Sequence, residues 1–244
     1  MIERYTLPEM GKIWTDSAKF QSWLKVEIAA CEANCSLGKI PEGAFKEICL
    51  KAKFEESRIK EIEKEVKHDV IAFLTNVNEF VGDSGRYIHV GMTSSDVLDT
   101  GLSLQLKESC ELLIEEIENL ENEVRLLARK HKNTLMIGRS HAIHGEPISF
   151  GFKLAGWLAE ILRNKKRLLT LKESVAIGQI SGAMGTYANT NPEVERITCN
   201  LLSLKPDTAS TQVISRDRHA EYVQMQSLMN LELQKLRKKL NTMS

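Results

Sequence analysis

The stretch that decides the fold runs from residue 97 to residue 130, VLDTGLSLQLKESCELLIEEIENLENEVRLLARK. Apolar residues recur in it at every third or fourth position, which predicts one amphipathic helix: Leu98, Leu102, Leu106, Cys110, Leu113, Ile117, Leu120, Val124 and Leu127. More than 30 residues pass without a proline, which exceeds a usual globular helix, and a break near Ser109 stays open. A helix of this length indicates an arm of a long bundle or coiled coil.

Two more long helices follow it in the sequence. Residues 148–173 carry large apolar side chains with glycine and alanine between them, so more than one neighbour must cover this helix. Residues 217–240 continue the helical pattern to the end of the chain. We therefore predict an all-α fold, in which a small N-terminal helical domain (1–108) precedes an incomplete long-helix bundle (109–244).

Shorter helices precede the bundle. Thr15 or Asp16 can cap a helix that ends at Gly38, with Pro41 shortly after it. Further helical patterns lie around residues 45–49, 58–66, 71–81 and 192–202. Most of these helices make up the predicted N-terminal domain.

The composition argues against several classes of function. Lys plus Arg and Asp plus Glu are 33 each, so no basic excess indicates nucleic-acid binding. The longest purely apolar run is about five residues, against the roughly 20 that a membrane span needs. The first residues contain no apolar leader, and the five cysteines lie mostly at apolar helical positions. We expect a cytoplasmic protein with reduced thiols that binds neither nucleic acid nor membrane.

Three polar breaks between the helices hold the residues that can do chemistry. They are Lys67-His68-Asp69, His89 with Thr93 and Ser94, and Ser140-His141 within GRSHAIHGEP (138–147). Histidine carries protons near neutral pH, and hydroxyls with free N–H groups at a helix N-terminus bind anions. Each break also has a structural explanation, because caps and helix junctions need the same residue types. The residues alone indicate either an acid–base site for an anionic ligand or a set of helix caps.

The same breaks predict two helix starts. Thr93 or Ser94 caps the longest helix, and Asp96 stands at capping-box spacing from Thr93. Pro147 falls where the next long helix is expected to begin, because its missing N–H is one that a first turn leaves unpaired.

Other catalytic interpretations fit the histidine-rich break less well. His141 and His144 form H-x-x-H with Glu146 nearby, but they lack the rigid H-E-x-x-H spacing of a zinc helix and a third ligand. Ser140 and His141 are sequence neighbours, which rarely face each other as nucleophile and base. The glycine-rich connector 178–187 lacks the Gly-Lys-Ser/Thr ending of a phosphate-binding loop. We therefore expect no metal site and no nucleotide cradle of that kind.

Six stretches of the chain match the sequence motifs of one protein family. They are KHDVIAF (67–73), HVGMTSSDVLDT (89–100), GRSHAIHGEP (138–147), MIERY (1–5), SGAMGTYA (181–188) and SRDRHA (215–220). Together they resemble the adenylosuccinate lyase family of the fumarase/aspartase superfamily. The resemblance extends over essentially the whole chain up to about Tyr222.

This resemblance implies an enzyme of purine biosynthesis. Such a lyase eliminates fumarate from adenylosuccinate to give AMP, and from the succinylated carboxamide ribotide (SAICAR) to give AICAR. The reaction needs a base, an acid and donors for a developing carbanion, and the resemblance implies no metal or redox cofactor. It also implies a small-molecule nucleotide substrate and a homotetramer, in which each site combines residues of three subunits.

The resemblance also implies roles for single residues. His141 is the general acid toward the leaving nitrogen, a task that suits a reference pKa of about 6.5, and His68 supports it and contacts the substrate. The other positions bind substrate: Arg4 and Tyr5 the phosphate, Lys67 and Asp69 the nucleotide, Thr93 and Ser94 a succinyl carboxylate, His89 the phosphate or the substrate's orientation, and Ser140 and Gln212 further groups.

The chain departs from the family pattern at three places. Lys67 stands where arginine is common, which keeps the charge but loses the bidentate fork, and Ser140 stands where threonine is common. The signature loop Gly-Ser-Ser-x-Met-Pro-x-Lys-x-Asn, with its catalytic-base serine, is absent. We therefore expect a truncated chain that is inactive alone. Two alternatives stay open: a non-catalytic helical oligomerisation module, which would bind no AMP, and a metal hydrolase, which elemental analysis would reveal.

Overall fold

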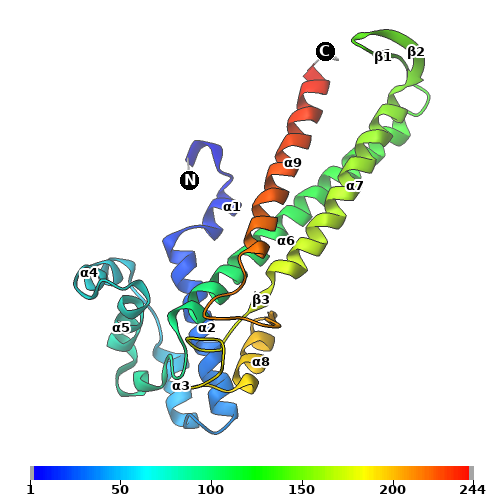
Figure 1. The fold of residues 1–244 in the computed structure, drawn as a ribbon. Helices are drawn as coiled ribbons and strands as arrows, with labels where there is room; N and C mark the ends of the chain where they lie inside the picture. The colour runs from blue at the N-terminus through cyan, green and yellow to red at the C-terminus, as the bar shows by residue number, and fades with distance from the viewer. Residues whose placement is uncertain (1–2, 242–244) are drawn as a thin grey trace. The chain divides into compact units, whose positions relative to one another are not determined.

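The computed structural model describes residues 3–241, with side chains from residue 4 to residue 238 (Figure 1). Within this range the chain forms two compact units. Unit 1 takes the residues up to Ser109 together with Val175–Arg216, and unit 2 takes Cys110–Ser174 and the residues from Asp217 onward. The ranges 1–108 and 109–244 from the sequence divide the longest helix at nearly the same place, whereas Val175–Arg216 lies in unit 1. The domain boundaries of a complete protein stay a prediction.

Unit 1 consists of helices, short 3-10 turns and one pair of very short parallel strands. Its elements besides the first part of α6 are η1 (Glu3–Tyr5), α1 (Pro8–Ile13), α2 (Asp16–Ser36), α3 (Glu42–Lys51), α4 (Glu56–Val66), α5 (Asp69–Val81), η2 (Gly82–Tyr87), β3 (Ile177–Gly178), α8 (Pro192–Leu201) and β4 (Lys205–Pro206). The expected cap of α2 is confirmed, because Thr15 Oγ1 accepts a hydrogen bond from the Ala18 N–H at 3.1 Å.

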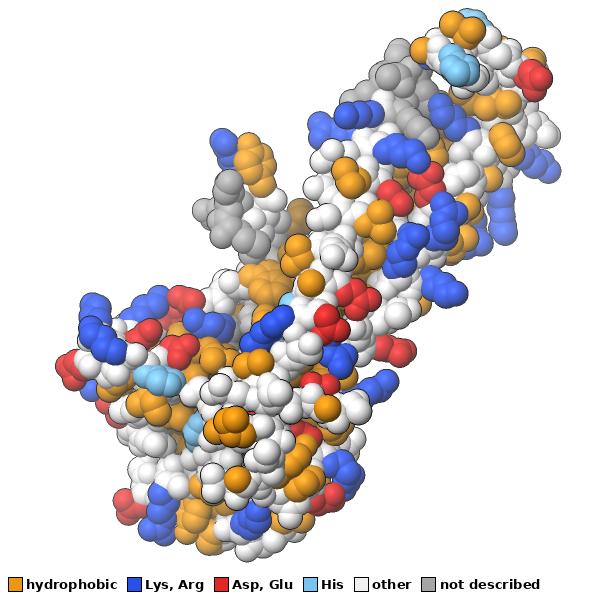
Figure 2. Space-filling model, in the orientation of Figure 1, with side chains coloured by type: hydrophobic (Ala, Val, Ile, Leu, Met, Phe, Trp, Pro, Cys, Tyr) orange, Lys and Arg blue, Asp and Glu red, His pale blue; other side chains and the backbone are white. Residues whose placement is uncertain are grey.

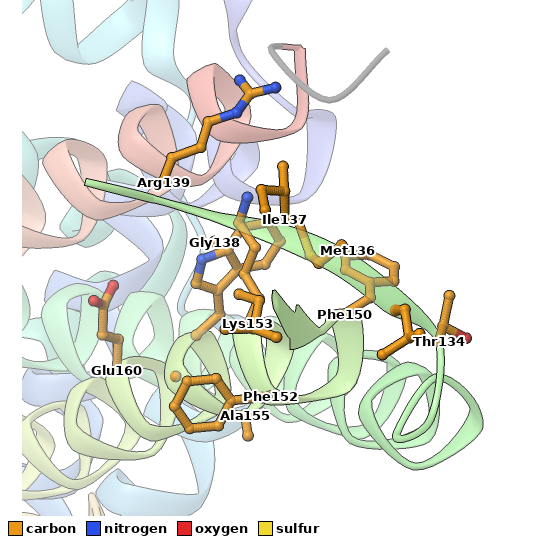
Figure 3. A pocket seen from close by; sticks show the side chains of 14 residues that line it. Thr134, Met136, Ile137, Gly138, Arg139, Phe150, Phe152, Lys153, Ala155 and Glu160 are labelled. Carbon is orange, nitrogen blue, oxygen red and sulfur yellow. The ribbon is translucent and has the colours of Figure 1, made fainter. Parts of the chain in front are cut away.

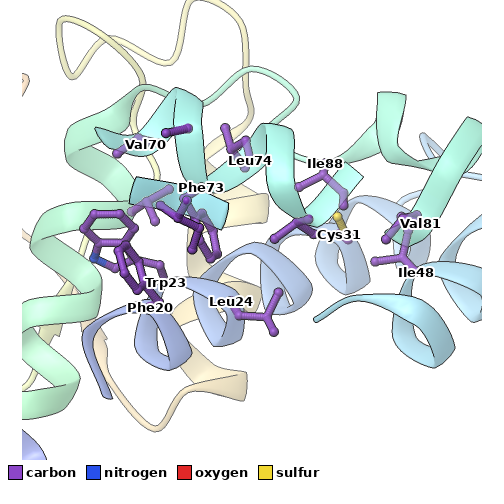
Figure 4. Packing of buried hydrophobic residues seen from close by; sticks show 14 of the residues in the cluster. Phe20, Trp23, Leu24, Cys31, Ile48, Val70, Phe73, Leu74, Val81 and Ile88 are labelled. Atoms are coloured by element: carbon purple, nitrogen blue, oxygen red, sulfur yellow. The ribbon is translucent and has the colours of Figure 1, made fainter. Parts of the chain in front are cut away.

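The core of unit 1 is built around aromatic side chains of α2 and α5 (Figure 4). The ring centroids of Phe20 and Trp23 lie 5.9 and 5.5 Å from that of Phe73, which is fully buried. Burying side chains of this size contributes about 1.5–3 kcal/mol each. The same cluster includes Ile88 and Val97, which flank the polar break at the start of α6. The apolar core therefore anchors both ends of that break.

α6 (Ser94–Lys130) is one helix of 37 residues. It continues past Ser109, so the break left open there does not occur. One of the two bonds of the predicted capping box is present: the Thr93 N–H donates to Asp96 Oδ2 at 3.0 Å, whereas no hydrogen bond joins the Thr93 hydroxyl to the Asp96 N–H. The helix therefore begins three residues before the apolar stripe at Val97, because the cap and not the stripe sets its start.

Unit 2 combines the second part of α6 with α7 (Phe150–Val175) and α9 (Asp217–Asn241). α7 buries Leu154, Trp157, Ile161 and Leu168, which recur at three-, four- and seven-residue spacing on one face. The described part of the chain is mostly helical, as predicted, and its strands form only two two-stranded sheets. The all-α fold class is confirmed.

Charged side chains join these helices to one another. Lys165 of α7 lies 2.9 Å from Glu118 and 3.1 Å from Glu121, both of α6. Lys235 of α9 lies 2.7 Å from Glu160 of α7. Pairs with exposed partners are worth little in stability, so their main effect is on the register of the helices.

The segment before α7 differs from the prediction. Residues expected as a loop and a helix start form an antiparallel hairpin, β1 (Leu135–Ser140) and β2 (Ile143–Ser149). Pro147 pairs with Ile137 in this hairpin and does not open α7, which begins at Phe150. A proline is tolerated there because both strands of a two-stranded sheet are edge strands.

Unit 2 leaves large apolar side chains in contact with solvent. Leu126, Phe152, Val223 and Leu231 are each 59–70% exposed, and Figure 2 shows hydrophobic side chains along the visible face of these helices. Side chains of α6, α7 and α9 also line a mostly apolar groove of about 310 Å³. Bundle surface of this kind is normally covered by further helices. Among residues 3–241, no helix has both the length and the apolar composition to cross a membrane.

Candidate active site

The junction of α4 and α5 places His68 beside the start of α6. Lys67 ends α4 in the left-handed conformation (φ 55°), and His68 is the N-cap of α5, where its Nδ1 accepts the Ile71 N–H at 3.4 Å. The same Nδ1 also lies 3.5 Å from Asp69 Oδ1. The other ring nitrogen, Nε2, lies 3.5 Å from Ser94 Oγ. The structure thus brings together one residue from each of the first two predicted breaks.

The start of α6 is held by a buried carboxylate. Asp96 is fully buried and accepts hydrogen bonds from four donors, the Thr93 N–H, the Ser181 and Gly182 N–H groups (3.1 Å each) and Gln179 Nε2 (3.2 Å). Burial raises the pKa of Asp96, and these donors offset part of that effect. Asp96 therefore joins the Thr93–Ser94 turn to the glycine-rich connector, which the capping pattern alone did not indicate.

A hydrogen bond from the glycine-rich connector also holds the segment of Gln212 in this neighbourhood. Gln179 Nε2 donates to the Gln212 main-chain oxygen at 2.7 Å, so one buried amide bonds both to Asp96 and to the segment of Gln212. Gly185 has φ 73°, and a Cβ there would lie 2.4 Å from the Ser210 main-chain oxygen. Only glycine allows this approach. Gln212 itself has an exposed side chain.

His89 has a buried partner that the sequence analysis missed. Its Nδ1 lies 2.6 Å from Glu27 Oε1 of α2, and Glu27 is 1% exposed. Burial lowers the pKa of His89, but the hydrogen bond and charge of Glu27, with the charge of Asp96, outweigh it and raise the pKa overall. The sequence did indicate that Glu27 is buried, because it occupies a helical position between Leu24 and Cys31 on the apolar face of α2.

Other predicted residues lie apart from this cluster. Arg4 and Tyr5 are exposed in η1, where the Arg4 guanidinium lies 4.7 Å from the Tyr5 ring centroid. Within residues 3–241, no contact joins this pair to His68, Ser94 or Gln212. Asp69, in contrast, belongs to the junction of α4 and α5, where its Oδ1 accepts the Val70 N–H and lies 3.5 Å from His68 Nδ1. These positions stay predictions.

Ser140 and His141 belong to unit 2, at the tip of the hairpin. Ser140 pairs with Ile143, so His141 and Ala142 form a two-residue turn in which both have positive φ (53° and 62°). Positive φ at both positions is typical of the type I′ turns that suit hairpin twist, although neither residue is glycine. The side chains of Ser140 and His141 are exposed, and Figure 2 shows histidine side chains on the surface of this part of unit 2.

A pocket of about 970 Å³ lies between this hairpin and α7, within unit 2 (Figure 3). Arg139 and Lys153 provide positive charge, Glu160 negative charge, and Phe152 and Met136 apolar surface. His141 does not line it. The pocket therefore gives no support to the predicted role of His141 as an acid.

The fold is shared with enzymes of known structure. A fumarate lyase from Mesorhizobium sp. BNC1 superposes with a TM-score of 0.89 at 30% identity, over 96% of this chain and 56% of that one. A 3-carboxy-cis,cis-muconate lactonizing enzyme from Pseudomonas putida superposes with a TM-score of 0.87 at 27% identity, over the same shares. A family model described as lyase matches residues 3–244, and the chain belongs to this lyase family.

Among relatives of known name, the chain is similar to adenylosuccinate lyases. It is 65% identical over 235 residues to that of Synechocystis sp. and 48% identical over 238 residues to that of Aquifex aeolicus. The corresponding enzyme of Bacillus subtilis is 46% identical over 235 residues. Each alignment covers 96% of this chain and 54% of the relative, so the chain spans about half the length of the relatives it matches.

Proposed function

We propose that these residues form part of an adenylosuccinate lyase, a carbon–nitrogen lyase of purine biosynthesis that releases fumarate from adenylosuccinate and from SAICAR. The similarity to adenylosuccinate lyases at 46–65% identity supports this activity. The single structural observation that carries it is the 3.5 Å contact between His68 Nε2 and Ser94 Oγ. An imidazole beside hydroxyls and N–H groups at a helix start suits a substrate that carries carboxylates.

In this proposal the start of α6 binds a succinyl carboxylate. Ser94 is the first residue of α6, so the Thr93 and Ser94 hydroxyls lie at the helix N-terminus, the positive end of the helix dipole. A carboxylate bound there would be held beside His68, whose Nε2 lies 3.5 Å from Ser94 Oγ. Lys67 and Asp69 at the same junction would contact the nucleotide, and Gln212 another group of the substrate.

The acid and the phosphate contacts complete the proposal. His141, exposed in the hairpin turn, would protonate the leaving nitrogen, and Ser140 beside it would contact the substrate. Arg4 and Tyr5 would bind the phosphate. His89 would either bind the phosphate as well or orient the substrate. The base is proposed to be a serine of the signature loop, which these 244 residues do not contain. The active protein would be a cytoplasmic homotetramer with sites shared among three subunits and no metal or redox cofactor.

The proposal is tested by a completed chain, in which the segments of the Synechocystis enzyme that this chain does not span are added to it. We expect this chain to form AMP and fumarate from adenylosuccinate, measured by chromatography of both products. Absence of turnover, in a completed chain that is folded and tetrameric, would contradict the proposed activity. Calorimetry with AMP separates it further from a non-catalytic helical module, for which no saturable binding is expected.

A further inference from the structure

Glu27 is a buried acid in which only one of the two carboxylate oxygens has a hydrogen-bond partner. Its Oε1 lies 2.6 Å from His89 Nδ1, whereas its Oε2 is buried and has no hydrogen-bond partner in the part of the chain that the structure describes. A buried carboxylate without a counter-charge is strongly unfavourable. An imidazolium at His89 supplies that counter-charge, and a neutral imidazole does not. The geometry therefore favours the charged form of His89.

The backbone around His89 shows that its position is imposed by packing. His89 has φ 66°, a conformation that costs energy in a residue other than glycine. Two residues later Gly91 has φ 75°, and a Cβ there would lie 2.1 Å from the Asn189 main-chain oxygen. The loop is thus pressed against the residues before α8 on one side and bonded to α2 on the other. The ring orientation depends on both.

The free end of the ring faces outward. His89 Nε2 has no hydrogen-bond partner among residues 3–241 and is not one of the buried unpartnered atoms, and the side chain is 18% exposed. Two acids act on the ring, Glu27 from α2 and Asp96 from α6. Asp96 already accepts four hydrogen bonds, so Glu27 is the acid that bonds to His89 directly.

We propose that Glu27 is a positioning residue, which fixes the ring of His89 and keeps it charged with Nε2 directed outward. That the outward Nε2 meets a phosphate or another anion of the substrate rests on the proposed function. The orientation and charge of His89 do not rest on it, and they are tested without any turnover.

The test uses diethylpyrocarbonate, which modifies imidazole only in its unprotonated form. The completed chain is treated with this reagent at a series of pH values, and mass spectrometry of peptides gives a rate for each of the six histidines. We expect the pH midpoint of His89 to lie above that of His144, which is exposed and serves as the reference in the same sample. A midpoint at or below that of His144 would overturn the proposal even if no variant folds.

The variants separate charge from packing. Glu27→Gln keeps the shape but removes the charge, so the midpoint of His89 should fall and its rate near neutral pH should rise. Glu27→Asp keeps the charge and should restore part of the shift. Glu32→Gln, an exposed position on the same helix, is the matched control and should leave the midpoint unchanged. An unchanged His89 midpoint in folded Glu27→Gln would show that this acid does not set the charge, whatever the activity of the chain.

Discussion

The Thr93 N–H donates to Asp96 Oδ2 at 3.0 Å, whereas the Thr93 hydroxyl makes no hydrogen bond to any residue the structure describes. The carboxylate of Asp96 therefore caps α6, and the hydroxyl of Thr93 is available to a ligand. In a usual cap the hydroxyl itself accepts an N–H, and its loss costs about 1 kcal/mol. Here stability and binding are assigned to different residues of one capping box.

Asp96→Ala should destabilise unit 1 strongly, because it leaves four buried donors without an acceptor. We expect a loss of at least about 3 kcal/mol, since each unpaired buried group costs roughly 1–3 kcal/mol. Thr93→Val should stay within about 0.5 kcal/mol of the parent, as substitutions without lost contacts do. Urea unfolding of the completed chain measures both. Equal losses would show that the Thr93 hydroxyl is part of the cap after all.

His141→Ala in the completed chain should lower turnover at least roughly 10²-fold while substrate binding stays largely intact, the usual scale for loss of a positioned acid. The measurement is kcat and KM for adenylosuccinate. His144→Ala, on the adjacent strand of the same hairpin, is the control and should stay near the parent. Near-normal turnover of the His141 variant would contradict its assignment, and equal loss of binding and turnover would indicate a folding role.

Arg4→Ala and Thr93→Val should affect different parts of the substrate. Arg4 is assigned to the phosphate, so its loss should weaken AMP binding more than fumarate binding. Thr93 is assigned to a succinyl carboxylate, so its valine variant should weaken adenylosuccinate more than AMP. Calorimetry with the completed chain compares the three ligands. The opposite ranking would mean that the two assignments are exchanged or wrong.

The buried pair of His89 and Glu27 should make stability depend on pH. The pKa of His89 is raised in the folded state, so its stabilisation is complete below the unfolded pKa of about 6.5 and is lost as pH rises through the folded pKa. His89→Gln should therefore cost on the order of 3 kcal/mol at pH about 6 and less at pH about 9. Urea unfolding at both pH values is the measurement, with exposed His144→Gln as control. A cost independent of pH would mean that His89 is not charged in the pair.

These 244 residues alone should release no fumarate from adenylosuccinate above background. The proposed base is absent from them, and loss of a catalytic base costs orders of magnitude in rate. We also expect poor solubility or irregular self-association through the exposed apolar faces of α6, α7 and α9.

Two changes on α9 test the second expectation. Val223 and Leu231 are 62% and 65% exposed, so Val223→Lys with Leu231→Lys should reduce association in sedimentation experiments. Gln224→Lys with Gln234→Lys, both at exposed positions, is a matched control that adds the same charge without removing apolar surface. Steady fumarate release from a soluble, well-folded 244-residue chain would contradict both expectations.

Several features of this protein were determined by its sequence alone. The apolar stripe after Val97, with Thr93 and Asp96 at capping-box spacing, predicted α6 and its cap. Helices can be read in this way because their hydrogen bonds and their capping contacts join residues three or four positions apart. The six motifs indicated the lyase family for the same kind of reason, since each is a short run of residues that is visible without any tertiary structure.

Only the tertiary structure decided the rest. Ser181 and Gly182 lie more than 80 residues from Asp96, whose charge they help to satisfy, and Glu27 lies 62 residues from His89. No local pattern selects one buried donor among many at such distances. The hairpin around His141 was missed because its turn has positive φ at residues other than glycine, and the strands gain their hydrogen bonds only once they pair. Contacts between distant residues, which depend on how the whole chain packs, therefore set the charge and orientation of the candidate site.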